Sequence, residues 1–155
     1  MRILFILPDV DSFHKLYIHF GIAYISGFLK KNGYDNIRFL TVTRVDDYRD
    51  IVNKVVSFKP DIVGFTSVET QFDNVVNLSK LIKEAWKCVI VCGGAFATLY
   101  PDCIKDAPDL DGIFMGESER AFLMFARTIE QGKDYHAIQN SVFIIKMKIA
   151  LLKIA

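Results

Sequence analysis

The sequence predicts a three-layer α/β fold in which a five-stranded parallel sheet lies between two layers of helices. Short apolar runs alternate along the chain with longer segments of helical periodicity, which is the pattern of βα units. The run at 88–92 is apolar on both alternating faces, as expected for a central strand that helices cover on both sides. Five strands in a single wind favour the flavodoxin-like (Rossmann-like) strand order 2-1-3-4-5.

The individual elements follow from the apolar spacing and from the residues that stop it. Strands are expected over residues 3–7, 36–42, 62–66, 88–92 and 111–115. Helices are expected over residues 16–31, 46–58, 70–86, 99–106 and 117–131. Gly33 and Gly132 follow two of these helices, at the position that favours a left-handed backbone.

The end of the chain departs from this alternation. Residues 145–149 alternate like a strand, but residues 142–155 as a whole fit neither a helix nor a strand. We therefore expect an α/β domain over residues 1–140 and an apolar tail over 141–155, at which a larger protein would continue into a C-terminal region. An unpaired apolar edge in this tail would favour a homo-oligomer.

Composition excludes several classes of function. With 155 residues, of which 52% are apolar and 24% charged, the chain suits one folded domain. The net charge is +1 and basic residues do not cluster in the sequence, so nucleic-acid binding is not expected. The C-terminal apolar run is too short and too charged to span a membrane. An odd number of cysteines and no secretory signal predict a reducing, cytoplasmic location.

The cysteines and histidines do not form a metal or catalytic set. Cys88 and Cys92 lie four positions apart on one expected strand, a geometry that suits neither a disulfide nor tetrahedral zinc, so we interpret them as buried thiols. The three histidines are too dispersed for a nucleophile–base pair, and no catalytic residue is expected. His14, in the loop after the first strand, is the histidine nearest to the expected cleft.

Loops at the carboxyl ends of the strands carry the candidate binding residues. In open α/β sheets ligands bind at this edge. The candidates follow the first, third, fourth and fifth strands in turn: Asp9, Asp11 and His14; Thr66, Ser67 and Glu69; Gly93, Gly94 and Thr98; Gly116 and Glu117. Small hydroxyl side chains and glycines leave room for a large, flat ligand and offer it uncharged hydrogen bonds.

Each loop also has a purely structural interpretation. Gly93 and Gly94 are typical of a tight βα turn. Ser67 suits a helix cap, and the acidic residues at 117–119 suit the positive end of a helix dipole. Neither G-x-G-x-x-G after the first strand nor a P-loop sequence is present, so nucleotide binding through those motifs is not expected.

Four segments together resemble the cobalamin-binding domain at the N-terminus of many radical-SAM enzymes. They are GIAYISGFLKKNG at 21–33, KPDIVGFTS at 59–67, VCGG at 91–94 and DGIFMGESE at 111–119. The last is similar to the Gly-Glu-Gly-Glu element of that family, with Ser118 in place of a glycine. The resemblance extends over about residues 2–141.

The resemblance implies that the corrin ring of cobalamin lies over the carboxyl edge of the sheet and that its nucleotide tail runs beside the sheet. By position it implicates Thr66, Ser67, Glu69, Gly93, Gly94, Gly116 and Glu117. It also implies a radical-SAM domain or partner protein, for which the cobalt would carry a methyl group or redox equivalents.

Two motifs depart from the wider family. In place of Asp-x-His-x-x-Gly, which supplies a lower axial histidine in cobalamin mutases and methionine synthase, Asp11 stands at the histidine position and His14 at the glycine position. The resembling radical-SAM proteins often lack this motif, so binding without a histidine ligand is expected. Cys-x-x-x-Cys-x-x-Cys is also absent. An iron–sulfur cluster and S-adenosylmethionine are therefore expected only in a missing C-terminal domain.

Two rival functions remain open on the sequence. A ligand-free interaction domain would keep the fold but fill the cleft with its own side chains, for which Phe13, Tyr17, Phe96 and Tyr100 are the candidates. A flavin or phosphosugar binder would use the hydroxyl groups of Thr66, Ser67 and Thr98 for a phosphate. The loop after the first strand lacks the Ser/Thr/Gly run on which such folds usually seat a phosphate.

Overall fold

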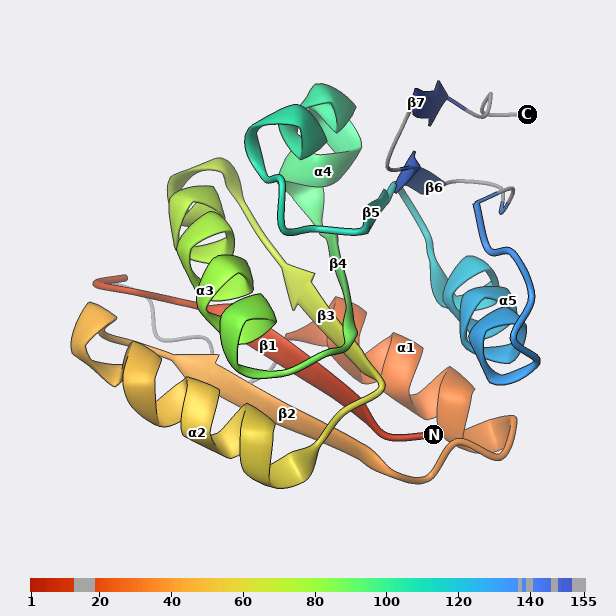
Figure 1. The fold of residues 1–155 in the computed structure, drawn as a ribbon, viewed down its shortest axis with the longest axis horizontal. Coiled ribbons are helices and arrows are strands. Elements are labelled where there is room, and N and C mark those ends of the chain that lie inside the picture. Colours follow the sequence, from red (N-terminus) through yellow and green to blue (C-terminus); the bar gives the residue numbers. More distant parts are fainter. Residues whose placement is uncertain (13–18, 137, 139–140, 146–147, 152–155) are drawn as a thin grey trace.

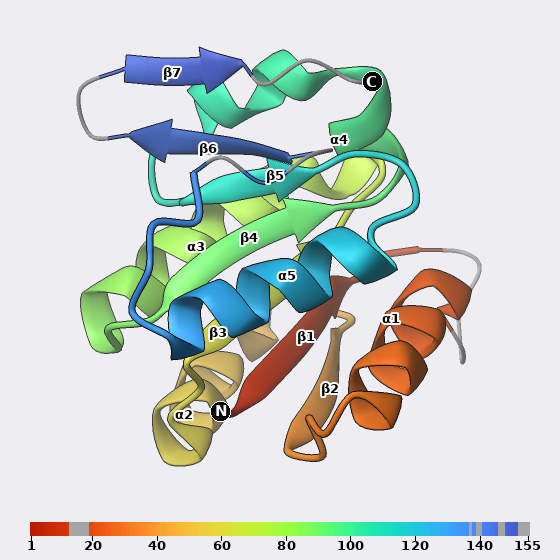
Figure 2. The ribbon, with the colours of Figure 1, turned by 90° about the vertical axis from the view of Figure 1, so that its right-hand side faces the viewer.

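The computed structural model describes residues 1–12, 19–136, 138, 141–145 and 148–151. Within them the sheet has seven strands in the order β2-β1-β3-β4-β5-β6-β7, which Figure 2 shows from the side of α1 and α5. The strands are β1 Ile3–Pro8, β2 Ile37–Val42, β3 Ile62–Thr66, β4 Val89–Gly93, β5 Gly112–Phe114, β6 Ser141–Ile145 and β7 Lys148–Leu151. The α-helices are α1 Phe20–Lys31, α2 Tyr48–Phe58, α3 Phe72–Ala85, α4 Ala95–Leu99 and α5 Glu119–Glu130.

The first five strands confirm the predicted flavodoxin-like topology. They pair in parallel in the order 2-1-3-4-5, with Ile3 of β1 opposite both Ile37 of β2 and Ile62 of β3. Helices α2 and α3 cover one face of the sheet, and α1 and α5 cover the other (Figure 1). No helix of the described residues is long and apolar enough to cross a membrane.

The sheet continues beyond the five predicted strands. Strand β6 pairs antiparallel with β5, and β7 pairs antiparallel with β6. The expectation that residues 142–155 form no strand is therefore wrong for these two segments. Pairing with β6 satisfies the backbone groups of an edge that β5 would otherwise leave open. Whether residues 141–155 begin a further region remains a prediction.

Two helical segments differ from the sequence prediction. After β4 the chain enters α4 directly at Ala95, and the expected helix at 99–106 is the short 3₁₀ helix η3, Pro101–Asp106. Two more 3₁₀ turns, η1 Val45–Asp47 and η2 Glu69–Gln71, lead into α2 and α3. Proline at the start of η3 costs no hydrogen bond, which fits a break between α4 and η3 at this point.

Each face of the sheet has its own apolar core. Side chains alternate along the strands, so Leu4 and Ile6 of β1 face α2 and α3, whereas Ile3 and Phe5 face α1 and α5. On the second face Gly64 makes room for Phe5, since a Cβ at Gly64 would lie 2.8 Å from the Phe5 ring. This face is the one that borders the candidate site.

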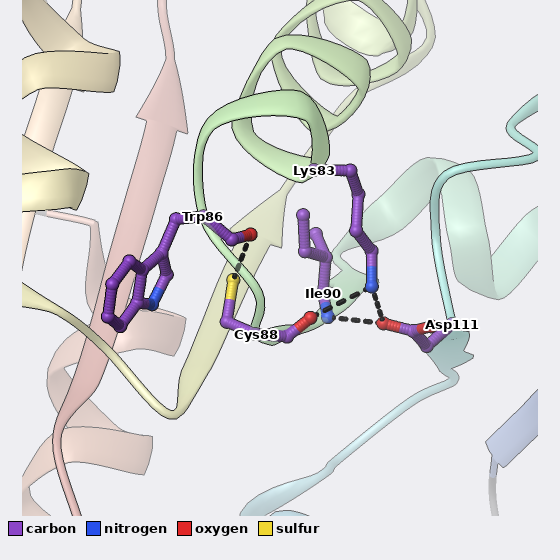
Figure 3. Close-up of polar contacts among 5 residues, drawn as sticks. All are labelled: Lys83, Trp86, Cys88, Ile90 and Asp111. Atoms are coloured by element: carbon purple, nitrogen blue, oxygen red, sulfur yellow. Dashed lines mark hydrogen bonds and ion pairs between the residues drawn. The ribbon is translucent and has the colours of Figure 1, made fainter.

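At the amino ends of the strands, polar side chains tie β4 to its neighbours (Figure 3). The Lys83 ammonium donates to Asp111 Oδ2 at 2.6 Å and to the Cys88 carbonyl at 2.8 Å. The Ile90 backbone N–H also donates to Asp111 Oδ2, at 2.7 Å. Trp86 adds a hydrogen bond from its indole N–H to the Pro60 carbonyl, at 2.9 Å. A half-buried ion pair therefore fixes the end of the sheet opposite to the candidate site.

Candidate cofactor-binding site

Backbone hydrogen bonds join the loops after β3, β4 and β5 at the carboxyl edge of the sheet. The Ser67 N–H donates to the Gly93 carbonyl at 3.0 Å, and the Phe96 N–H donates to the Ser67 carbonyl at 3.2 Å. The Thr98 hydroxyl donates to the Gly94 carbonyl at 2.9 Å and accepts from the Gly116 N–H at 3.0 Å. Ser67 and Thr98, both predicted from the sequence, thus hold the loops together.

Gly94 occupies a position that no other residue fits. Its φ is +100°, and a Cβ there would lie 2.7 to 2.8 Å from the Ser67 backbone and from Thr66 Oγ1. At Gly93 the nearest atom to an added Cβ would be the Phe114 carbonyl oxygen at 3.8 Å, which is an ordinary contact. The tight-turn interpretation is therefore confirmed for Gly94, whereas Gly93 leaves room on the α1/α5 face.

The capping interpretation of Ser67 is wrong, whereas the acidic Glu119 does lie in the first turn of α5. The Ser67 hydroxyl donates to the adjacent Val68 carbonyl at 2.7 Å and caps no helix. The Ser118 hydroxyl donates to the Gly116 carbonyl at 3.0 Å, within its own loop, and makes no cap bond to α5. Both hydroxyl groups shape their loops, and both side chains are buried.

The side chain of Gln71 forms hydrogen bonds with the backbone of the loop after β1. The Gln71 side-chain oxygen accepts from the Val10 N–H at 3.1 Å, and its amide nitrogen donates to the Val10 carbonyl at 3.0 Å. Asp9 is buried beside this contact, and Asp11 is exposed with a φ of +52°. His14 lies outside the described residues. The sequence did not indicate Gln71, because a glutamine before a helix carries no specific signal.

A narrow slot of about 160 Å³ opens between the sheet and helices α1 and α5, next to these loops. Its apolar lining includes Phe5, Ile22, Phe114 and Phe122. Five of the residues predicted from the sequence line it as well: Thr66, Gly93, Gly94, Gly116 and Glu117. The structure thus gathers five of the eleven predicted residues around one mostly apolar space. Glu69, by contrast, is exposed in the η2 turn and is not among the residues that line the slot.

His19 is a residue of the slot that the sequence interpretation missed. It is the N-cap of α1, and its Nδ1 accepts from the Ile22 N–H at 3.2 Å. Its Nε2 lies 3.3 Å from Thr66 Oγ1. Burial of the ring lowers the pKa of His19 below its ordinary value of 6.5. The sequence carried no signal for this N-cap, because it placed His19 inside the helix expected over residues 16–31.

A wider groove of about 1050 Å³ lies farther out between α1 and α5. Three exposed apolar side chains line it: Phe20, Tyr24 and Met124. It shares Glu117 and Glu119 with the slot. Apart from Glu117, the residues of the outer groove belong to α1 and α5, whereas the slot reaches the sheet.

The cysteines are confirmed as buried, free thiols. Burial raises the pKa of Cys88 and of Cys103 to about 11, and it raises the pKa of Cys92 further. Such thiols remain protonated and unreactive at neutral pH. Across the described residues, no group of three or more histidine, cysteine or acidic side chains is placed to hold a metal ion.

The fold is shared with solved structures of radical enzymes. The chain superposes with a TM-score of 0.81 and 17% identity on a structure described as the radical S-adenosylmethionine methyltransferase TsrM from Kitasatospora setae, covering 96% of this chain and 30% of that one. A structure of the cobalamin-dependent S-adenosylmethionine radical enzyme OxsB with aqua-cobalamin bound gives a TM-score of 0.79 at 12% identity, over 100% of this chain and 23% of that one. These likenesses establish the fold.

Sequence relatives are also much longer proteins. The chain is 32% identical over 149 residues to the anaerobic magnesium-protoporphyrin IX monomethyl ester cyclase of Rubrivivax gelatinosus, covering 92% of this chain and 27% of that protein. It is 34% identical over 126 residues to the cytidylyl-2-hydroxyethylphosphonate methyltransferase of Streptomyces wedmorensis, covering 68% and 23%. The chain thus spans about a quarter of these relatives.

The family model of the B12 binding domain matches residues 7–126. This range begins in β1, ends in α5 and contains every described loop that lines the slot. The expected resemblance to a cobalamin-binding domain is confirmed: the chain belongs to the B12-binding domain family.

Proposed function

We propose that the chain binds cobalamin, with the corrin ring over the carboxyl edge of the sheet and the nucleotide tail in the slot. The observation that carries this proposal is the slot itself, which lies beside the loops of the B12-binding family and is lined by aromatic rings. An engineered cavity of roughly 150 Å³ with an apolar lining binds benzene, so a space of about 160 Å³ suits a flat aromatic base.

The residues present fit such a tail. Gly64 and Gly93 give the slot a floor without side chains, and Gly94 brings its backbone against Ser67. Thr66 offers a hydroxyl group at the same place. We assign Asp9, Asp11, Glu69 and Thr98 to the rim, near the corrin. When bound, cobalamin supplies a cobalt centre that can carry a methyl group or change its redox state.

We further propose that the chain is the cobalamin-binding module of a radical-SAM enzyme. Relatives of which it spans about a quarter support this, because a longer protein has room for the second domain. The chain has no Cys-x-x-x-Cys-x-x-Cys, so the iron–sulfur cluster and S-adenosylmethionine would be held by that domain. In the described part of the sheet, β7 is the last strand, and a second copy or the partner domain would pair there.

The rival functions have less support. Phe96 packs on Phe72 with ring centroids 5.0 Å apart and on Tyr100 at 5.8 Å, and neither Phe96 nor Tyr100 lines the slot. Phe13 and Tyr17 lie outside the described residues. A phosphate ligand would need the hydroxyl groups of Ser67 and Thr98, but these bond backbone groups of the loops and do not line the slot.

A visible-absorption titration with hydroxocobalamin and methylcobalamin tests the proposal. We expect saturable spectral changes, and for methylcobalamin the spectrum of a cobalt whose lower base has left. Gly93→Leu would fill the slot and abolish binding, because Gly93 lines the slot and an added Cβ there would meet only Phe114, at 3.8 Å. Gly27→Leu, the same change in the outer groove, is the matched control and keeps binding. No spectral change with the unaltered chain would refute cobalamin binding, and unaltered binding by Gly93→Leu would refute the slot as the tail site.

A further inference from the structure

Exposed apolar side chains frame the outer groove between α1 and α5. Phe20 is 73% exposed, Tyr24 69% and Met124 56%. They lie on two helices that pack side by side on one face of the sheet (Figure 2). Single exposed apolar residues are normal on a protein surface, but several of them along one groove indicate an interaction surface. The slot does not account for these side chains, because none of the three lines it.

Gly27 provides a second observation on the same surface. It lies in the interior of α1 and lines the outer groove together with Phe20 and Tyr24. Outside the backbone of α1, a Cβ at Gly27 would have no atom of the described residues within 4 Å. Packing among these residues therefore does not require a glycine here, although glycine is unfavourable in the interior of a helix. A bare position beside two exposed rings suits the close approach of a second backbone.

The charged side chains of the groove lie at its two ends. They are Lys31, Glu117, Glu119 and Arg120, and none of them forms an ion pair with another residue in the described part of the chain. Lys31 lies in the last turn of α1, whereas the other three lie in or just before the first turn of α5. Both helices follow parallel strands, so their first turns are at the carboxyl edge of the sheet and their last turns at the opposite edge. The groove thus has a net negative charge at one end and a positive charge at the other.

A surface with opposite charges at its two ends is complementary to a copy of itself turned by a half rotation. We propose that the outer groove is an interface between two copies of this chain, in which the α1 helices pack antiparallel about a two-fold axis near Tyr24 and Gly27. Lys31 of each copy then lies beside Glu119 of the other, so this contact occurs twice. The exposed rings form the apolar centre of the interface, and the charged side chains form its rim. This inference goes beyond the proposed function, since it does not require cobalamin.

Sedimentation velocity of the whole chain without cobalamin tests this proposal. We expect a reversible monomer–dimer equilibrium with a Kd of roughly 10–100 µM, as for a small interface. Lys31→Glu and Glu119→Lys each place like charges at both contacts and should raise the Kd about tenfold or more. An equal mixture of the two variants should dimerise again, because a mixed pair has opposite charges at both contacts. Lys30→Glu is the matched control: it makes the same charge change one residue earlier, outside the groove, and should leave the Kd nearly unchanged.

Two further variants test the apolar centre of the interface. Tyr24→Ser removes an exposed ring and Gly27→Leu keeps the helices apart, so each should raise the Kd about tenfold or more. Leu99→Ser is the control, since Leu99 is 83% exposed but lies outside the groove.

Three results would overturn the proposal. The first is a chain that stays monomeric at roughly 500 µM, well above the expected Kd. The second is a dimer that persists in Lys31→Glu and in Tyr24→Ser, which would place the contact on another surface, such as the edge strand β7. The third is a mixture of Lys31→Glu and Glu119→Lys that stays monomeric, which would exclude the antiparallel arrangement. A failure of cobalamin binding in the absorption titration would refute the proposed function and leave the dimer in place.

Discussion

The two ends of strand β4 are stabilised in different ways. At the amino end, long side chains provide the contacts: Lys83 and Asp111 form an ion pair of 2.6 Å that also holds the Ile90 N–H (Figure 3). At the carboxyl end, the contacts are backbone hydrogen bonds and one threonine hydroxyl, with glycines where side chains would stand. The amino end of β4 is therefore stabilised by charged side chains, whereas the packing at its carboxyl end requires residues without side chains.

This difference separates stability from ligand binding along one strand. A glycine-rich edge can bring backbone close to a bulky ligand, but it contributes little burial of its own. The ion pair at the opposite end is half-buried, with its two side chains 26% and 30% exposed, which makes its hydrogen bonds worth more than those of a surface pair. Substitutions of Gly94 at one end and of Asp111 at the other test whether the two ends are independent.

The largest effect is expected from Gly94→Ala. Its Cβ would lie 2.7 to 2.8 Å from the Ser67 backbone, at a φ of +100°. We expect a loss of unfolding free energy of about 2–4 kcal/mol and a loss of cobalamin affinity of tenfold or more. Urea denaturation and absorption titration measure the two effects. Gly93→Ala, with no neighbour closer than 3.8 Å, is the control for stability and should leave the free energy of unfolding nearly unchanged. An equal loss of unfolding free energy in the two variants would contradict this account of Gly94.

Asp111→Asn should have a smaller effect, confined to stability. The amide keeps an oxygen that can accept from the Ile90 N–H but loses the charge that pairs with Lys83. We expect a loss of about 1–2 kcal/mol in urea denaturation and an unchanged dissociation constant for cobalamin. Asp50→Asn is the control. The Asp50–Lys54 pair is more than half exposed and should contribute about 0.5 kcal/mol or less. A fall in affinity with Asp111→Asn would show that the two ends are coupled.

The sequence predicted best what depends on local pattern. Buried parallel strands read as continuous apolar runs, which is why β3 and β4 were found within a residue or two. Gly93 and Gly94 stood out because two adjacent glycines end such a run. The short helix α4 was missed because five residues are too few to show the apolar periodicity of a helix. It also has no side-chain cap that the sequence could have indicated.

Features that depend on distant partners were not predictable. The contact between His19 and Thr66 joins residues 47 positions apart, and that between Val10 and Gln71 joins residues 61 apart. Strand β6 exists by pairing with β5, and its own pattern is weak. Local spacing contains no information on such pairs, because the fold brings them together.

The smallest predicted effect is the response of stability to pH through His19. The pKa of His19 is lowered in the folded chain by burial, whereas the unfolded chain has the ordinary value of 6.5. Above pH 6.5 His19 is neutral in both the folded and the unfolded chain. The contribution of its neutral ring to the free energy of unfolding is then fully present. As the pH falls from 6.5 towards the folded pKa, the unfolded state binds more protons, so stability decreases. The slope cannot exceed about 1.4 kcal/mol per pH unit, the value for one proton.

Urea denaturation of the unaltered chain and of His19→Asn between pH 7.5 and roughly pH 5 measures this response. The ionisable groups that line the slot with His19 are Glu117 and Glu119, and both variants retain them. The unaltered chain should therefore lose stability faster than His19→Asn as the pH falls below 6.5. A constant difference between the two proteins across this range would mean that the ring takes up its proton equally in both states, and that burial does not hold His19 neutral at the carboxyl edge.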